Sequence, residues 1–310
     1  MPRAARFQDW IALFILTVFW GSAFLLTEIA LRALDPSALV FMRIALGSAF
    51  LLVYVLLSGS TLPTSVAGWT SLSIMALLGL VLPFHLVAWA QLVLDSSTTG
   101  VLMATMPLIV LVLAHYTIPG STLTPARIRG FVIGFIGVLF VIGPLDGSEL
   151  TNNATFFAAL GVLGAVVSYA LNTIYVRRKT IGNPVGMSAG MLVFGSLLTL
   201  PTAIAAQPEV PVPLPALAAA AALGLLSTGL ASVLYFRLVQ GPGPAFLSLV
   251  NYLVPGWAVL LGYFVLGEQP ATSTWCGLAL ILFGVAMSEF GPRLRLIVTR
   301  RLVRDVAEKS

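Results

Sequence analysis

Charged residues are scarce in this chain. Only 9% of its 310 residues are Asp, Glu, Lys or Arg, whereas 59% are hydrophobic and the mean hydropathy is +1.02. A water-soluble globule of this length needs far more polar surface than such a composition supplies. The composition therefore predicts a polytopic membrane protein.

Cysteine and histidine are scarcer still. The single cysteine, Cys276, excludes an intrachain disulfide, and two histidines are too few to suggest a metal cluster, so we expect no metal and no cofactor. The phosphate-binding pattern G-x-x-x-x-G-K-[ST] is absent, which argues against an ATP-driven pump. No Asp occurs within the apolar runs and no Ser–His motif is recognisable, which argues against an intramembrane protease. We expect a protein that is not an enzyme.

Long apolar runs make up most of the chain. A helix needs about 20 apolar residues to cross the hydrocarbon core, and ten such runs alternate with short breaks rich in Gly, Pro, Ser and charge. The runs are too long and too uniformly apolar for the strands of a β-barrel, and only helices close their own backbone hydrogen bonds. The predicted fold class is all-α, with ten transmembrane helices at residues 10–33, 37–57, 67–92, 97–116, 126–142, 154–176, 185–206, 214–239, 245–266 and 273–289.

Basic residues follow one set of connections. They lie before the first run, between the fourth and fifth, between the sixth and seventh, at the end of the eighth and after the tenth, whereas acidic residues collect in the opposite connections, with Arg32 as the only basic residue there. The positive-inside rule then places both termini in the cytoplasm, with the chain in a plasma membrane, the inner membrane in bacteria. The basic tail suits either an anionic leaflet or solvent. We expect lipid as a partner. We expect no nucleic acid, because the cationic clusters are short and lack the interleaved aromatic residues that stack on bases. A monomer is one possible oligomeric state.

The two halves of the chain resemble each other. The segment "GVLMATMPLIVLVLAHY" from Gly100 matches "SLVNYLVPGWAVLLGYF" from Ser248, with Pro107 over Pro255, and further matches precede and follow it. Each half then holds five spans, and this odd number inverts the second copy in the membrane. We divide the chain into a first repeat (1–150), a second repeat (151–291) and a basic cytoplasmic tail (292–310). Inverted repeats around a central cavity are typical of secondary transporters; an ancient duplication without transport is the alternative.

Several short motifs, taken in order, resemble one family. They are "FWGSAF" in the first run, "FMRIALG" in the second, the proline-centred fourth and ninth runs, "SLVNYLVPGWAVLLGYFVLGE" and "WCGLALILFGVAM". Together they resemble the drug/metabolite transporter superfamily in its EamA-type branch, and within it the YddG-type exporters of aromatic amino acids. This resemblance implies a basket of helices around a central cavity, alternating access by rocking of the two halves, export as the direction, and no ATP hydrolysis.

Two prolines lie near mid-membrane depth at matching positions of the repeat. Pro107 and Pro255 each remove a backbone hydrogen bond about ten residues into their runs and should kink or loosen the helix. We interpret them as gate hinges, with static kinks as the alternative. In the first run, small Gly21 and Ser22 allow close helix approach, whereas Trp20 is too deep for the interfacial aromatic belt and should line the central space.

Aromatic and neutral polar side chains recur at mid-membrane depth. Such side chains must face other helices or a water-filled space, so we predict that they line a substrate cavity; helix packing with a few interhelical hydrogen bonds is the alternative. The candidates are Trp20, Phe84, His85, Trp89, Ser168, Tyr169, Asn172, Asn251 and Tyr252. Without a cluster of Lys or Arg for phosphates, this set suits an amphipathic solute such as an amino acid with an apolar side chain, or a lipophilic amine.

Glu28 and Arg43 are the ionisable residues most deeply placed in the outer leaflet. Their estimated depths match, and an unpaired charge in a membrane helix is costly, so we predict a structural ion pair between the first two spans. The alternative is that Arg43 receives a substrate carboxylate and Glu28 takes part in proton coupling. Glu268, at the outer boundary, is expected to act as a cap or interface residue.

These observations predict a secondary transporter that moves small amphipathic metabolites out of the cell by alternating access. The resemblance favours aromatic or other apolar amino acids as the solute. A multidrug or lipophilic-amine exporter is one alternative. An uncoupled, channel-like pore is another, of a different class.

Overall fold

The computed structural model describes residues 3–118, 121–143, 153–178, 183–206 and 211–307. Within these ranges every regular element is a helix, which confirms the all-α fold. Nine helical stretches are long and apolar enough to cross a membrane, and a tenth stretch, Val250–Leu266, is apolar but shorter. The prediction of ten spans is confirmed. The boundary expected between residues 150 and 151 lies outside the described residues.

The helices agree with the predicted runs to within a few residues, except that the last one continues through the predicted tail. In chain order they are α1 (Phe7–Leu31), α2 (Pro36–Ser58), α3 (Val66–Ala76), η1 (Leu77–Val81), α4 (Leu82–Ala90), α5 (Ser96–Met103), α6 (Met106–Thr117), α7 (Pro125–Ile142), α8 (Asn153–Arg178), α9 (Pro184–Ala205), α10 (Leu214–Ala222), η2 (Leu223–Leu230), α11 (Ala231–Gln240), α12 (Pro244–Leu247), α13 (Val250–Leu261), η3 (Gly262–Leu266) and α14 (Thr272–Ala307).

Polar caps followed by proline begin several spans. Asp35 accepts a hydrogen bond of 2.8 Å from the backbone N–H of Ser37, and Pro36 is the first residue of α2. Asn183 caps α9 in the same way, with Pro184 as the first helical residue. The cap oxygen satisfies one free N–H, and proline has none to satisfy. These sequences therefore start a new span only a few residues after the previous one ends.

Three spans contain wider π-type turns. These are η1 in the third span, η2 in the eighth and η3 in the ninth. Gly79 in η1 and Gly224 in η2 occupy matching positions of the sequence repeat. Because a π turn departs from the regular α-helical hydrogen-bond pattern, the third and eighth spans are irregular at the same point of the two halves.

Both predicted hinge prolines lie in interrupted spans. The fourth span is divided into α5 and α6, with Ala104 and Thr105 in the turn between them and Pro107 in the first turn of α6. Pro255 lies inside α13, and the turn in its span lies farther away, between α12 and α13. The break therefore adjoins the proline in one half only. The role of either proline as a gate hinge stays a prediction.

Helices of the first half pack against helices of the second, and these contacts come in matching pairs. The first span packs on the eighth and ninth, as the sixth packs on the third and fourth. The second span packs on the eighth, as the seventh packs on the third, while α2 packs on α9 and α7 on α14. Each pairing has its counterpart, which is the pattern expected of two related five-helix units.

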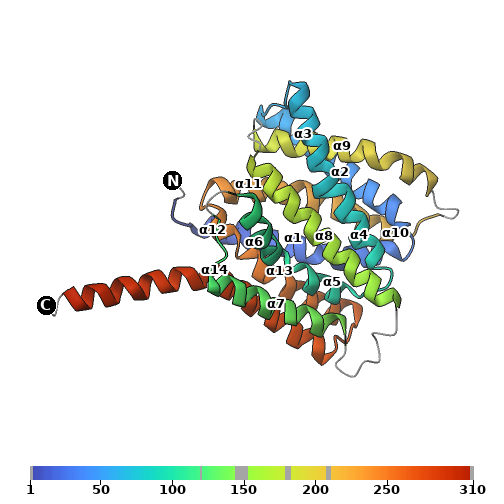
Figure 1. Cartoon of the computed structure of the whole chain (residues 1–310). Helices are drawn as coiled ribbons and strands as arrows, with labels where there is room; N and C mark the ends of the chain where they lie inside the picture. The colour runs from blue at the N-terminus through green and yellow to red at the C-terminus, as the bar shows by residue number, and fades with distance from the viewer. Residues whose placement is uncertain (1–2, 119–120, 144–152, 179–182, 207–210, 308–310) are drawn as a thin grey trace.

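Small residues bring α7 and α14 into close contact. A Cβ atom on Gly137 would lie 2.8 Å from the carbonyl oxygen of Gly277, and one on Gly130 would meet the backbone of Gly284. Glycines at such positions allow the backbones of two membrane helices to approach closely. The fifth and tenth spans thus form a tight pair at one side of the bundle (Figure 1).

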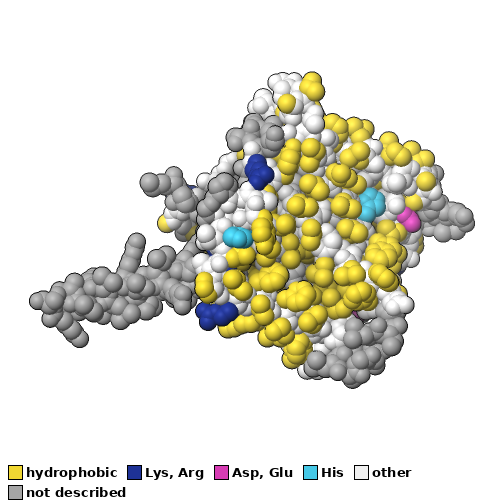
Figure 2. Space-filling model, in the orientation of Figure 1, with side chains coloured by type: hydrophobic (Ala, Val, Ile, Leu, Met, Phe, Trp, Pro, Cys, Tyr) yellow, Lys and Arg dark blue, Asp and Glu magenta, His cyan; other side chains and the backbone are white. Residues whose placement is uncertain are grey.

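The visible face of the molecule in Figure 2 carries a broad apolar zone. In Figure 2 apolar side chains cover the middle of the visible face, and basic side chains lie nearer the end at which both termini emerge in Figure 1. We call that end the termini end and the opposite one the far end. The apolar zone is the surface expected of a multi-pass protein whose helices meet lipid.

Candidate functional site

Arg43 lies inside the bundle, between helices of both halves. Its Nε donates a hydrogen bond of 3.0 Å to Oγ1 of Thr228 in η2. Its Cζ lies 3.8 Å from the centre of the Phe84 ring in α4, a cation–π distance. The guanidinium group of α2 is therefore held by the third span and by the eighth.

A small cavity adjoins this guanidinium group. It has room for about one water molecule, and its walls come from α1, α2 and α4. Apart from the guanidinium and one hydroxyl, whose oxygen donates to the carbonyl of Ala23 at 2.7 Å, the walls are apolar. The lining residues are Thr27, Leu39, Val40, Arg43, Phe84, Val87 and Ala88.

Glu28 and Arg43 do not form the predicted ion pair. Glu28 Oε1 lies 4.0 Å from Nη2 of Arg32, one helical turn away, and Oε2 accepts a hydrogen bond of 3.2 Å from the backbone N–H of Ser96. Arg43 instead contacts Thr228 and Phe84. The prediction rested on matching depths in adjacent spans, but depth does not determine the direction in which a helical side chain projects.

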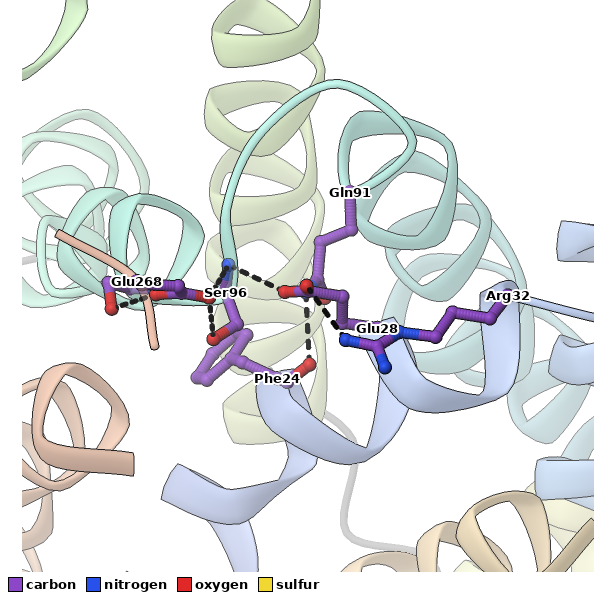
Figure 3. Close-up of polar contacts among 7 residues, drawn as sticks. Phe24, Glu28, Arg32, Gln91, Ser96 and Glu268 are labelled. Carbon is purple, nitrogen blue, oxygen red and sulfur yellow. Dashed lines mark hydrogen bonds and ion pairs between the residues drawn. The ribbon is translucent and has the colours of Figure 1, made fainter. Parts of the chain in front are cut away.

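Two carboxylates from different halves converge on the start of α5 at the far end (Figure 3). Glu268, which follows η3, accepts hydrogen bonds from N and Oγ of Ser96 at 3.0 and 2.7 Å, and also from N and Oγ of Ser97. Glu28 shares the Ser96 N–H. The first N–H groups of a helix have no intrahelical acceptor and attract negative charge. The expected cap role of Glu268 is therefore confirmed, and we call Glu28, Ser96, Ser97 and Glu268 the far-end latch.

Two glycines shape the segment that carries Glu268 to α5. Gly267 has a φ of +69°, in the left-handed region that favours glycine. A Cβ atom on Gly262 would overlap the Glu268 carboxylate and the Ser97 hydroxyl. The Glu268 N–H in turn donates to the Gly262 carbonyl at 3.0 Å. The sequence "GYFVLGE" therefore needs glycine at both positions to hold Glu268 in the latch.

The connection before α5 concentrates acceptor groups. Partial burial and the nearby charge of Glu268 raise the pKa of Asp95 above its ordinary value. The Asp95 side chain makes no cap hydrogen bond to α5. An ionised Asp95 therefore destabilises this end of the bundle.

Gln91 lies in the same connection. It donates from Nε2 to the Phe24 carbonyl at 3.0 Å (Figure 3), and its buried Oε1 has no hydrogen-bond partner among the described residues.

The structure brings two of the predicted cavity residues close to Arg43. Phe84 lines the cavity, and Tyr169 of α8 packs against the same interior cluster as Phe84. This arrangement joins an aromatic wall and a cation, as expected for a site that binds an amphipathic solute.

His85 and Trp89 lie on a neighbouring face of α4. Each follows a cavity-lining residue by one position, which turns it by about 100° around the helix. Nδ1 of His85 lies 2.7 Å from the Val81 carbonyl oxygen of its own span. Trp89 is 46% exposed and packs against Gly161 of α8. The structure therefore places neither side chain among the residues that line the cavity.

Ser168 and Asn172 face the π turn of the third span. Ser168 Oγ donates a hydrogen bond of 2.7 Å to the Leu78 carbonyl in η1. The Asn172 amide packs against Gly79, where a Cβ atom would lie 3.0 Å from its Cγ. Asn172 Oδ1 is buried without a hydrogen-bond partner among the described residues. These contacts fit the alternative interpretation, in which the polar stripe of α8 packs and hydrogen-bonds to another helix.

Trp20 and Tyr252 belong to other interior clusters. The Trp20 ring lies 5.9 Å from that of Tyr235 in α11. Tyr252 donates from its hydroxyl to Glu289 in α14 at 3.2 Å, and Asn251 next to it is partly buried. The structure thus distributes these three residues around the bundle and does not gather them at Arg43.

The close helix approach expected in the first span is present. A Cβ atom on Gly21 would lie 2.7 Å from Cδ1 of Trp257 in α13, and Trp257 Nε1 donates to Ser22 Oγ at 3.1 Å. Sequence reasoning did not single out Trp257. It also missed Thr228, although a hydroxyl pair, Ser227 and Thr228, in the middle of an apolar run was a signal that a polar partner lies nearby.

The chain is similar to known proteins along most of its length. The sequence model of the EamA-like transporter family matches the chain twice, at residues 9–143 and 156–290. The chain is 28% identical over 293 residues to "Uncharacterized inner membrane transporter YedA" of Escherichia coli (strain K12), covering 91% of each protein. It is 25% identical over 280 residues to "Uncharacterized transporter YoaV" of Bacillus subtilis (strain 168), covering 88% of this chain and 94% of the relative. A solved crystal structure has the same fold, with a TM-score of 0.67 at 20% identity, over 96% of this chain and 99% of that one.

Proposed function

We propose, from the premise that this chain belongs to the EamA-like transporter family, that it is a secondary transporter and not an enzyme. Its solutes are small amphipathic metabolites, with aromatic and other apolar amino acids preferred, and its direction is export. The observation that carries the proposal is the guanidinium group of Arg43, which Phe84 of the third span and Thr228 of the eighth hold between the two halves, beside a cavity whose walls come from the first half. Secondary transporters bind their solute at such an interface between repeats.

The proposed cycle alternates access between the two ends of the bundle. At the far end, the latch ties Glu268 of the second half to Ser96 and Ser97 of the first. At the termini end, Arg3 binds Asp9 at 2.5 Å and donates from its backbone N–H to the Gly241 carbonyl at 3.2 Å, which joins the first span to the end of the eighth. In this cycle each end opens when its contacts break. Rocking of the two halves is the movement that the fold family implies.

We place the protein in the plasma membrane, the inner membrane in bacteria, with both termini in the cytoplasm. The E. coli relative is named an inner membrane transporter, which supports this location. The charge pattern supports the orientation, because the basic residues lie in the connections at the termini end. The far-end latch then faces outward.

Reconstitution in liposomes tests the proposal. Purified protein should carry labelled phenylalanine, tryptophan or threonine with saturable kinetics, above the leak of protein-free liposomes, and a pH gradient should reveal any proton coupling. Absence of flux for every amino acid and lipophilic amine tried would remove the proposal. Unsaturable passage of unrelated solutes would indicate the channel-like alternative. The direction is tested in cells, since cells that express the protein should lose preloaded labelled phenylalanine faster than cells with an empty vector.

A further inference from the structure

We infer that Arg43 is the recognition site for a carboxylate on the transported solute. This inference rests on the proposed function and narrows it, because it selects carboxylic acids, amino acids included, over lipophilic amines.

The guanidinium group has a neutral partner and spare donors. It carries five N–H donors, and its one hydrogen bond among the described residues goes from Nε to the hydroxyl of Thr228. The ion pairs among those residues are Arg3–Asp9 and Arg32–Glu28, so no described carboxylate pairs with Arg43. The two terminal nitrogens are therefore available for an acceptor that the protein itself does not supply.

The contacts orient the group without neutralising it. Phe84 covers one face at 3.8 Å and Thr228 holds the Nε edge at 3.0 Å, from the third and eighth spans respectively. An unpaired charge inside a membrane protein is costly and usually marks a functional site. A planar guanidinium with two free nitrogens matches the two oxygens of a carboxylate. The structure thus presents a positioned fork for a planar anion.

The cavity beside Arg43 is narrow in this structure. It has room for about one water molecule, so a solute carboxylate reaches the guanidinium group only when the bundle opens. The remaining walls of the cavity, among them Leu39, Val40 and Val87, are apolar. One guanidinium balances one negative charge, which fits a carboxylate better than a doubly charged phosphate. The site therefore suits the carboxylate end of a small solute, with the apolar part of that solute against Phe84.

Four solutes that share one phenyl group test the inference on wild-type protein. L-Phenylalanine and 3-phenylpropionate carry the carboxylate, whereas L-phenylalaninamide and phenethylamine lack it. Binding is measured as the concentration-dependent rise in unfolding temperature of the purified full chain in detergent. We expect both acids to bind at least tenfold more tightly than the amide and the amine, since a charge-assisted bidentate contact is lost without the carboxylate. Equal binding of acids and amines would overturn the inference, and so would binding of none of the four.

Substitution of Arg43 gives the second measurement. Arg43→Gln should weaken binding of both acids at least tenfold and leave binding of phenethylamine unchanged, and Arg43→Lys should recover part of the loss because it keeps the charge without the fork. Arg129→Gln, the same change at an exposed position of α7, is the matched control. Acid binding that persists in Arg43→Gln would overturn the inference. If Arg43→Gln does not fold, the comparison of acid with amide on wild-type protein decides.

The two proposals fail in different ways. Saturable liposome flux of amines, with no preference for acids, would remove the carboxylate site and leave the transporter standing. Absence of flux for any solute would remove the transporter proposal, and the carboxylate site would fall with it.

Discussion

Loss of the Glu268 carboxylate should open the far end of the bundle. The side chain accepts four hydrogen bonds from Ser96 and Ser97, and no other described residue accepts a hydrogen bond from Ser97 N. A hydrogen bond to a charged acceptor contributes about 1.5–3 kcal/mol. Four bonds to one partly exposed carboxylate are not additive, and Glu268 also repels the nearby carboxylates of Glu28 and Asp95, so we expect Glu268→Ala to weaken the latch by about 1–2 kcal/mol. This corresponds to roughly a 5- to 30-fold shift of an equilibrium between closed and open far ends.

A single thiol in the cavity can report that shift. Cys276 is the only cysteine, so Thr27→Cys in a Cys276→Ser background places one thiol in the cavity wall. A membrane-impermeant thiol reagent added from the far side should label this residue faster in the Glu268→Ala protein. Glu268→Gln keeps one acceptor oxygen and should give a smaller increase. Gln269→Ala, a change at the exposed neighbour, is the control.

Equal labelling rates would contradict the role of the Glu268 carboxylate in the latch. If Glu268→Ala and Gln269→Ala label at the same rate as the unsubstituted reporter, and all three proteins unfold at the same temperature, then the carboxylate does not hold the far end closed. Faster labelling in both variants would instead point to a general loosening of the loop after η3.

Three further predictions concern stability and are measured by thermal unfolding of the purified protein. The folded-state pKa of Asp95 is raised, so its ionised form destabilises the fold at neutral pH, and this destabilisation disappears as the pH falls through the raised pKa. Asp95→Asn should therefore raise the unfolding temperature at pH 7, and this increase should become smaller toward pH 4. A lower unfolding temperature at pH 7 would contradict the raised pKa. Gly262→Ala should lower the unfolding temperature, because its methyl group overlaps the Glu268 carboxylate; unchanged stability would show that the segment after α13 adjusts freely. Ser168→Ala removes the hydrogen bond to the Leu78 carbonyl and should lower the free energy of unfolding by about 1 kcal/mol. Loss of solute binding with unchanged stability would instead indicate that Ser168 lines the solute cavity.

Much of the fold could be read from the order of residue types. The length of each apolar run set the number of helices, and Asp35–Pro36 and Asn183–Pro184 mark helix starts because capping and proline geometry are local. The candidate site was harder to predict. Phe84 lines the cavity while its neighbour His85 does not, since a step of one residue turns a helical side chain by about 100°. The two positions lie at nearly the same depth in one apolar run, so the sequence alone could not show which of them lines the cavity.

Contacts between distant spans could not be predicted from the sequence. Arg43 and Glu28 lie at similar depth in adjacent spans, yet each has another partner. Thr228 is 185 residues from Arg43, and Ser96 is 172 residues from Glu268. Such pairs depend on the rotation of each helix about its axis and on the irregular turns η2 and η3, which no short-range pattern specifies.

The amino-acid sequence by itself determined the membrane class, the ten spans, the twofold repetition and the starts of several helices, because hydrophobicity, proline and capping act within a few residues. Tertiary packing decided which polar side chains meet. It placed the Arg43 guanidinium between Phe84 and Thr228, and it carried Glu268 to the start of α5. The physical reason is that a helix determines the depth and spacing of its side chains, whereas their partners depend on how the helices pack against one another.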